Sequence, residues 1–176
     1  MKIAVDQITE SPQEISFSEG IEELNLIYTE NEIRDFLFPP FLDVNFVYYR
    51  SGREIFFQGG LRGTIEGSCG RCLQSYSFPV ERKFDFVLTP DPFWAKSKEL
   101  NWDEMGLSFY AAEEINLSPF IREQVLLALP MRPLCKDGCR GLCGGCGVNL
   151  NDEPCLCASS SGDPRMAPFG ALKIGR

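Results

Sequence analysis

The eight cysteines of this 176-residue chain are the residues whose type and spacing point most clearly to chemistry. Six of them lie in one stretch, from Cys135 to Cys157, that reads CKDGCRGLCGGCGVNLNDEPCLC. The other two, Cys69 and Cys72, form a C-x-x-C motif far upstream. Because the chain has no histidine, any transition-metal site in it must be rich in thiolates. Four thiolates around one ion suit zinc best, so we expect structural zinc in one or two four-cysteine sites.

The spacing allows two ways of dividing the cysteines between two sites. The grouping we favour makes a local site from the last four: Cys143, Cys146, Cys155 and Cys157. The second site then joins the upstream motif to the start of the Cys-rich stretch: Cys69, Cys72, Cys135 and Cys139. The alternative joins the two C-x-x-C motifs and leaves Cys135, Cys139, Cys155 and Cys157 together. Closing shorter loops costs less entropy, which favours the first grouping, but the sequence leaves both open.

Other chemistry finds less support in the sequence. The cysteine spacing does not match ferredoxin motifs. A closed four-thiolate site leaves no position for a catalytic water, and no βαβ pattern surrounds Cys69 and Cys72 to favour thioredoxin-like chemistry. The sequence has no P-loop, no G-x-S-x-G motif and no dinucleotide fingerprint, and its carboxylates form no evident acid/base pair. We therefore expect no enzymatic activity.

The residues around Cys69 and Cys72 predict a long β-hairpin with the C-x-x-C at its tip. Residues 43–50 and 54–67 are rich in β-branched and aromatic residues or alternate with period two, and Gly59-Gly60 suggests a bulge or bend. Residues 76–88 alternate again, with apolar side chains on one parity that Arg82 interrupts. Pro79 indicates that this strand lies at an edge.

A single clear helix is predicted to begin at Ser118-Pro119, with Ser118 as N-cap, and to end before Pro130. It leads directly into Cys135, whereas residues 89–117 read as a loop with little regular structure. We expect an α+β fold, with a mainly antiparallel β-sheet or partly open barrel, one helix and a C-terminal Cys-rich zinc-binding segment. Residues 1–130 would form the β-rich body, and residues 131–176 the metal-binding segment and tail packed on it.

Charge is unevenly distributed along this acidic chain, whose net charge is −8. Residues 1–117 carry 10 Lys+Arg against 20 Asp+Glu, whereas residues 118–176 carry 7 against 5. Such a chain is a poor non-specific binder of nucleic acid. We find no membrane-spanning run and no signal sequence, which predicts a cytoplasmic protein with no membrane partner. A reducing cytosol in turn favours metal ligation over disulfides.

The ordered motifs resemble the YceD family, whose members are linked to accumulation of large-subunit ribosomal RNA. The resemblance covers residues 54–170 and rests on CGRCL at Cys69, LPMRPLC at Leu129, CRGLCGGCG at Cys139, NLN at Asn149, CLC at Cys155 and the DPR of the tail. It implies a non-enzymatic role in biogenesis of the large ribosomal subunit. It supplies no active site.

Two hypotheses for function follow. In the first, the chain is an assembly factor whose basic residues in the C-terminal part contact a ribosomal protein or rRNA of the large-subunit precursor: Arg132, Lys136, Arg140 and Arg165. The acidic half would suit a basic ribosomal protein. In the second, the thiolates make the chain a metal- or redox-responsive regulator, which requires accessible cysteines of low pKa.

Overall fold

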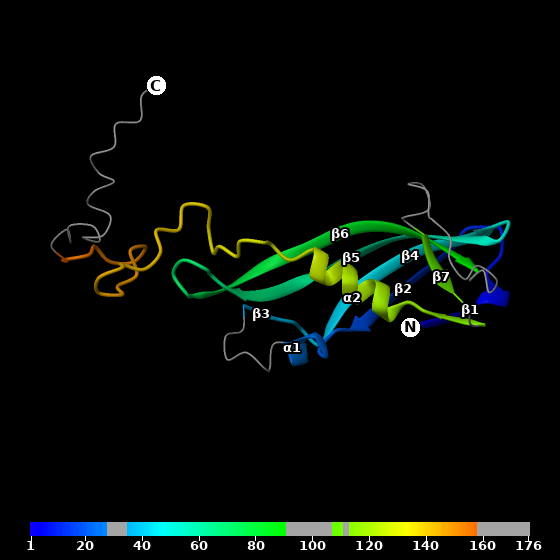
Figure 1. The fold of residues 1–176 in the computed structure, drawn as a ribbon, viewed down its shortest axis with the longest axis horizontal. Helices are drawn as coiled ribbons and strands as arrows, with labels where there is room; N and C mark the ends of the chain where they lie inside the picture. Colours follow the sequence, from blue (N-terminus) through cyan, green and yellow to red (C-terminus); the bar gives the residue numbers. More distant parts are fainter. Residues whose placement is uncertain (28–34, 91–106, 111–112, 158–176) are drawn as a thin grey trace, which may run out of the picture.

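A six-stranded, mostly antiparallel β-sheet forms the body of the protein in the computed structural model, which describes residues 1–27, 35–90, 107–110 and 113–157 (Figure 1). Its strands are β2 (Gln13–Gly20), β3 (Phe36–Leu37), β4 (Phe41–Ser51), β5 (Glu54–Ser68), β6 (Ser75–Pro90) and β7 (Leu107–Tyr110). They are ordered β2-β4-β5-β6-β7, and β3 pairs with β5 beyond the end of β4. The sheet does not close into a barrel. The expected α+β class is confirmed, in its open-sheet form.

The longest pairing in the sheet is the β5–β6 hairpin, which places the C-x-x-C motif at its tip. The ladder runs from Ile55 opposite Leu88 to Ser68 opposite Ser75. Residues 69–74 connect the strands, and the backbone N–H of Cys69 donates to the carbonyl of Gln74 at 2.9 Å. The predicted hairpin is confirmed. Figure 1 shows its tip directed towards the Cys-rich segment.

One face of the sheet is covered by helix α2 (Ser118–Leu127), which runs across the strands (Figure 1). Ile121 and Val125 are fully buried beneath it, and the ring of Phe120 stacks on that of Phe86 with centroids 4.7 Å apart. Arg82, the polar residue on this apolar face, donates to the side chain of Gln124 at 3.1 Å. The interruption of the apolar pattern therefore marks the residue that ties β6 to the helix.

Arg82 also donates to the backbone carbonyl of Leu127 at 3.2 Å, at the last turn of α2. A cation that hydrogen-bonds a terminal carbonyl stabilises the end of a helix. The chain leaves this anchored end and continues through Pro130 into the Cys-rich segment. The anchored helix thus sets where that segment begins.

A small two-stranded sheet lies at the far end of the body and pairs β1 (Lys2–Ala4) with β8 (Glu114–Asn116). A 3₁₀ turn, η1 (Val5–Gln7), directly follows β1. The short helix α1 (Leu24–Ile27) follows β2. The prediction that residues 89–117 contain little regular structure is wrong for β7 and β8. None of the helices in the described part of the chain is long and apolar enough to cross a membrane.

Two local expectations need correction. Of the bulge or bend expected at Gly59-Gly60, the bulge is absent, because pairing with both neighbouring strands continues through the two glycines. A Cβ on Gly59 would come within 2.7 Å of the ring of Phe46, so glycine makes room there for a core side chain.

Ser118 is not the N-cap of helix α2. Leu117 occupies that position and makes no side-chain cap bond, while the side-chain oxygen of Asn116 accepts from the backbone N–H of Ser118 at 3.2 Å.

Candidate metal centre

The first group of cysteines, which we call the hairpin cluster, joins the β5–β6 tip to the start of the Cys-rich segment: Cys69, Cys72, Cys135 and Cys139. The Sγ atoms of Cys69 and Cys139 lie 3.7 Å apart, as do those of Cys72 and Cys135. All four sulfurs lie within 4.8 Å of one another. Three of these residues are buried, and Tyr76 and Leu134 pack against them in a core separate from that of the sheet.

The second group, the distal cluster, lies entirely within the Cys-rich segment: Cys143, Cys146, Cys155 and Cys157. The Sγ of Cys155 lies 3.1 Å from that of Cys143 and 3.7 Å from that of Cys146. Cys146 and Cys157 are exposed, so this cluster faces solvent much more than the hairpin cluster does. The structure thus brings the cysteines together in the favoured grouping and not in the alternative.

The sulfur positions fit a tetrahedral zinc ion. With zinc–sulfur bonds of about 2.3 Å, neighbouring sulfurs of a tetrahedron lie about 3.8 Å apart. Three of the four Sγ–Sγ distances quoted above are 3.7 Å. Even the shortest, at 3.1 Å, is well beyond the roughly 2.05 Å of a disulfide, and all eight cysteines are free thiols.

Backbone donors around the hairpin cluster also favour thiolates. Burial raises the pKa of Cys69, but the backbone N–H groups of Cys135, Cys72 and Arg71 donate to its sulfur and lower the pKa to about 6. Burial, together with hydrogen bonds to Cys72 and Cys139, raises the pKa of Cys135 to about 12. Neighbouring sulfurs therefore do not all ionise on their own. A divalent cation would supply the positive charge that holds all four as thiolates.

In the distal cluster, too, one cysteine has a lowered pKa and another has a raised pKa. The backbone N–H of Cys146, the thiol of Cys155 and the backbone N–H of Gly145 lower the pKa of Cys143 to about 6. Hydrogen bonds with the sulfurs of Cys146 and Cys155 raise the pKa of Cys157 to about 12. The N–H of Gly145 lies 3.4 Å from Cys143 Sγ, and that of Cys157 lies 3.2 Å from Cys155 Sγ. Such N–H···S bonds support the ligand atoms of a metal site.

Backbone contacts hold the Cys-rich segment against the hairpin tip. The N–H of Gly70 donates to the carbonyl of Pro133 at 2.8 Å, and that of Leu142 to the carbonyl of Arg71 at 3.1 Å. The guanidinium of Arg71 donates to the carbonyl of Cys139 at 2.9 Å. Gly141 has a φ of 74°, and a Cβ there would lie 3.1 Å from the Arg71 carbonyl. Glycine therefore permits both the turn and the close approach.

Sequence reasoning did not assign a role to Asn151, which lies between Cys146 and Cys155. Its side-chain N–H donates to Cys139 Sγ at 3.3 Å, so a residue from the loop of the distal cluster contacts a sulfur of the hairpin cluster. The N-L-N motif that contains Asn151 was visible in the sequence. The motif does not predict which cysteine sulfur its side-chain amides contact.

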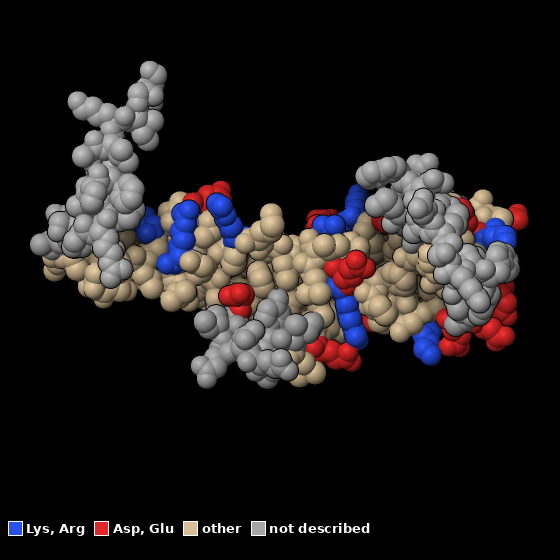
Figure 2. Space-filling view, viewed as in Figure 1, with Lys and Arg blue, Asp and Glu red and all other residues tan. Residues whose placement is uncertain are grey.

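The predicted partner-contact residues that the structure describes are exposed on the Cys-rich segment: Arg132, Lys136 and Arg140. Arg165 lies outside the described residues. Figure 2 shows Lys and Arg side chains at this end of the molecule, and Asp and Glu gathered most densely at the other end, around β1. Met131 and Leu156 are almost fully exposed, at 100% and 95%, which adds apolar surface to the same segment.

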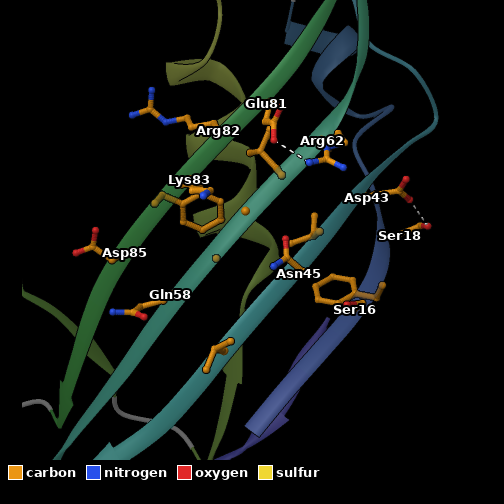
Figure 3. Close-up of a pocket in the computed structure, with 17 residues that line it drawn as sticks. Ser16, Ser18, Asp43, Asn45, Gln58, Arg62, Glu81, Arg82, Lys83 and Asp85 are labelled. Carbon is orange, nitrogen blue, oxygen red and sulfur yellow. Dashed lines mark hydrogen bonds and ion pairs between the residues drawn. The ribbon is translucent and has the colours of Figure 1, made fainter. Parts of the chain in front are cut away.

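The sheet face opposite α2 carries a shallow hollow of about 900 Å³ (Figure 3). Residues of β2, β4, β5 and β6 line it, and one of them is Gly60 of β5, which has no side chain. Arg62 and Glu81 form an ion pair at 2.7 Å on its rim. Lys83 and Asp85 lie on one side of the hollow, and Asp43 lies on the opposite side. The hollow therefore carries charges of both signs. The hollow contains no cysteine and is separate from both clusters.

The open sheet and the two groups of cysteines define an α+β protein with two candidate thiolate metal centres, one at the hairpin tip and one in the Cys-rich segment. A family model described as "Large ribosomal RNA subunit accumulation protein YceD" matches residues 57–173, a range that includes all eight cysteines. The match covers more than half of the sequence, and the chain therefore belongs to the YceD family.

Two curated plant relatives carry a similar description. The chain is 25% identical over 147 residues to "Large ribosomal RNA subunit accumulation protein YCED homolog 1, chloroplastic" of Arabidopsis thaliana, covering 70% of this chain and 46% of that protein. It is 28% identical over 134 residues to the protein of that name in Zea mays, covering 61% and 45%. An uncharacterized protein of Mycobacterium tuberculosis is 32% identical over 118 residues, covering 64% and 53%.

The chain spans about half the length of the curated relatives it matches. No solved structure matches it significantly.

Proposed function

We propose that this chain is a non-enzymatic factor that supports biogenesis of the large ribosomal subunit and accumulation of its rRNA. The observation that carries the proposal is the family match over residues 57–173, which spans most of the hairpin, helix α2 and both cysteine clusters. The names of the plant relatives refer to the same process. The chain would act where large subunits are assembled. The cytoplasm remains our prediction for this chain, while the plant relatives are described as chloroplastic.

Zinc has a structural role in this proposal. Each cluster offers four cysteine sulfurs within 4.8 Å of one another, and a closed four-thiolate site leaves no coordination position for a substrate or water. The ions would fix the Cys-rich segment on the hairpin tip. That segment would then be a rigid surface formed on the sheet and not an independent unit.

The surface proposed for the partner is this Cys-rich end, with its exposed cations Arg132, Lys136 and Arg140. The partner proposed for this surface is a ribosomal protein or rRNA of the large-subunit precursor, and the family description, which refers to large-subunit ribosomal RNA, supports a ribosomal partner. The acidic opposite end would keep the remainder of the molecule away from RNA, since like charges repel.

Depletion of the protein from its host cell tests the function. The expected result is a lowered ratio of large-subunit to small-subunit rRNA and an accumulation of incomplete large subunits in sucrose gradients. Complementation with Arg132→Gln/Lys136→Gln/Arg140→Gln should fail to restore the ratio, whereas the control Arg53→Gln, on the exposed β4–β5 turn, should restore it. Normal rRNA ratios and normal subunit profiles after depletion would refute the proposal.

The exposure of the distal cluster favours a second candidate, a thiolate-based metal- or redox-responsive regulator. Cys146 and Cys157 are open to oxidants and competing metals. Thiol titration of the native, zinc-loaded protein separates the two functions. Rapid oxidation of the distal cysteines with zinc release would favour regulation, and unreactive cysteines would favour a purely structural role.

A further inference from the structure

Asn151 lies in the loop between Cys146 and Cys155 of the distal cluster, and both polar atoms of its side chain contact the hairpin cluster or its backbone. Its Nδ2 donates to Cys139 Sγ at 3.3 Å and to the side-chain oxygen of Asn149 at 2.8 Å. Its Oδ1 accepts from the backbone N–H of Arg140 at 2.9 Å. Because Arg140 directly follows Cys139, the side-chain amide of Asn151 hydrogen-bonds both to the sulfur of Cys139 and to the backbone of the next residue.

The same network reaches the hairpin loop. Asn149 donates to the carboxylate of Asp152 at 2.8 Å, and that carboxylate accepts from the side chain of Gln74 at 3.2 Å. Gln74 is two residues beyond Cys72. The loop from Asn149 to Asp152 therefore contacts both chain segments that supply cysteines to the hairpin cluster.

Two cysteines of the distal cluster, Cys146 and Cys155, flank this loop. Binding of one ion by these two cysteines would close the loop and reduce the number of conformations open to Asn151. A donor to a ligand sulfur stabilises the thiolate and orients it. Loss of such donors costs metal sites about 10- to 100-fold in affinity.

We propose that Asn151 is a positioning residue that couples the two sites, so that zinc in the distal cluster strengthens zinc binding in the hairpin cluster. This inference rests on the proposed zinc sites. It adds that they fill cooperatively and that the coupling runs through one hydrogen bond from Asn151 to Cys139. By linkage, zinc in the hairpin cluster strengthens the distal site by the same factor.

The test measures zinc retention at the hairpin cluster in the full chain. Zinc-loaded protein is challenged with a graded chelator, and the cysteines that become free are alkylated and identified by mass spectrometry. Labelling of Cys69 and Cys139 reports the hairpin cluster separately from the distal one. The variants are Asn151→Ala, Cys155→Ser/Cys157→Ser and the combination of all three changes, with Asn45→Ala on the far sheet face as control.

We expect Asn151→Ala and Cys155→Ser/Cys157→Ser each to weaken the hairpin site about tenfold. The combined variant should lose no more than either alone, because both remove the same interaction. Asn45→Ala should match the wild type. Unchanged hairpin affinity after loss of the distal cysteines, or losses that multiply in the combined variant, would overturn the coupling.

Asn151→Asp distinguishes a hydrogen bond to sulfur from a role in loop shape alone. Aspartate can still accept from the Arg140 N–H, but it donates nothing to Cys139 and places a negative charge beside the thiolate. We expect it to weaken the hairpin site more than Asn151→Ala does. An Asn151→Asp protein with wild-type affinity would contradict the coupling. Wild-type protein that binds fewer than two zinc ions would instead overturn the proposed sites.

Discussion

The Sγ atoms of Cys69 and Cys139 lie 3.7 Å apart, although 70 positions separate the two residues in the chain. The intervening residues include β6 and helix α2, which Arg82 and Gln124 tie together. The hairpin cluster thus closes a long loop through the body, whereas the distal cluster closes only short loops within the Cys-rich segment. This difference leads to unequal effects on stability.

Substitution of Cys69 by serine should destabilise the protein much more than substitution of Cys146. Cys69 is fully buried, and a ligand bond there constrains a long loop, an effect of about 3 kcal/mol or more by analogy with disulfide cross-links. Cys146 is exposed and local. Urea unfolding of the zinc-loaded variants measures the difference, and equal losses would count against the hairpin cluster as the main structural site.

Gly59→Ala and Gly60→Ala form a matched pair that tests the packing of the sheet. A Cβ at Gly59 would come within 2.7 Å of the buried ring of Phe46 and 3.1 Å of the Asn45 carbonyl, and we expect a loss of about 1–3 kcal/mol. A Cβ at Gly60 meets the end of the exposed Asn45 side chain at 2.9 Å, which can rotate away. Thermal unfolding should show a large loss for the first variant only.

Leu73→Gly should stabilise the hairpin tip. Leu73 has a φ of 61°, a region in which non-glycine residues are strained, and its side chain is 68% exposed and contributes little burial. Glycine relieves this strain but also gives the unfolded chain more conformational entropy, which opposes the gain. We expect the net effect to raise the free energy of unfolding by up to about 1 kcal/mol. Leu73→Ala serves as control, since alanine keeps the strain. A glycine variant less stable than the alanine variant would refute this reasoning.

Gln124→Ala should loosen the contact between β6 and α2. The substitution removes the acceptor for the partly buried Nε of Arg82, and we expect a loss of about 1–2 kcal/mol. Glu123→Ala, an exposed neighbour on the same helix, is the matched control. Hydrogen exchange of the amides of α2 should rise in the first variant. If both variants exchange alike, Arg82 is not an anchor of the helix.

The hairpin and the cysteine grouping were accessible from the sequence because each depends on local pattern. Alternation in residues 76–88 fixes one face of β6, the C-x-x-C falls between two clear strands, and loop-closure entropy favours Cys143 with Cys155. Strands β7 and β8 were missed, since stretches of four and three residues have no recognisable period and depend on distant partners.

The roles of Gly59 and Asn151 were also beyond the reach of the sequence. A glycine pair in a strand is compatible with a bulge or with a large neighbour, and only the position of Phe46 decides between them. The amide of Asn151 reaches a sulfur 12 positions away in the chain, across the gap between two clusters. Such contacts are set by tertiary packing and not by spacing.

Zinc content of paired serine variants tests the central claim most directly. Two four-cysteine sites in the grouping seen here predict two zinc ions in the wild type, one in Cys69→Ser/Cys135→Ser, which damages a single site, and none in Cys69→Ser/Cys143→Ser, which damages both. Metal analysis of the purified proteins gives the numbers. The reverse result for the two variants would establish the alternative grouping, and a wild type without zinc would contradict the account.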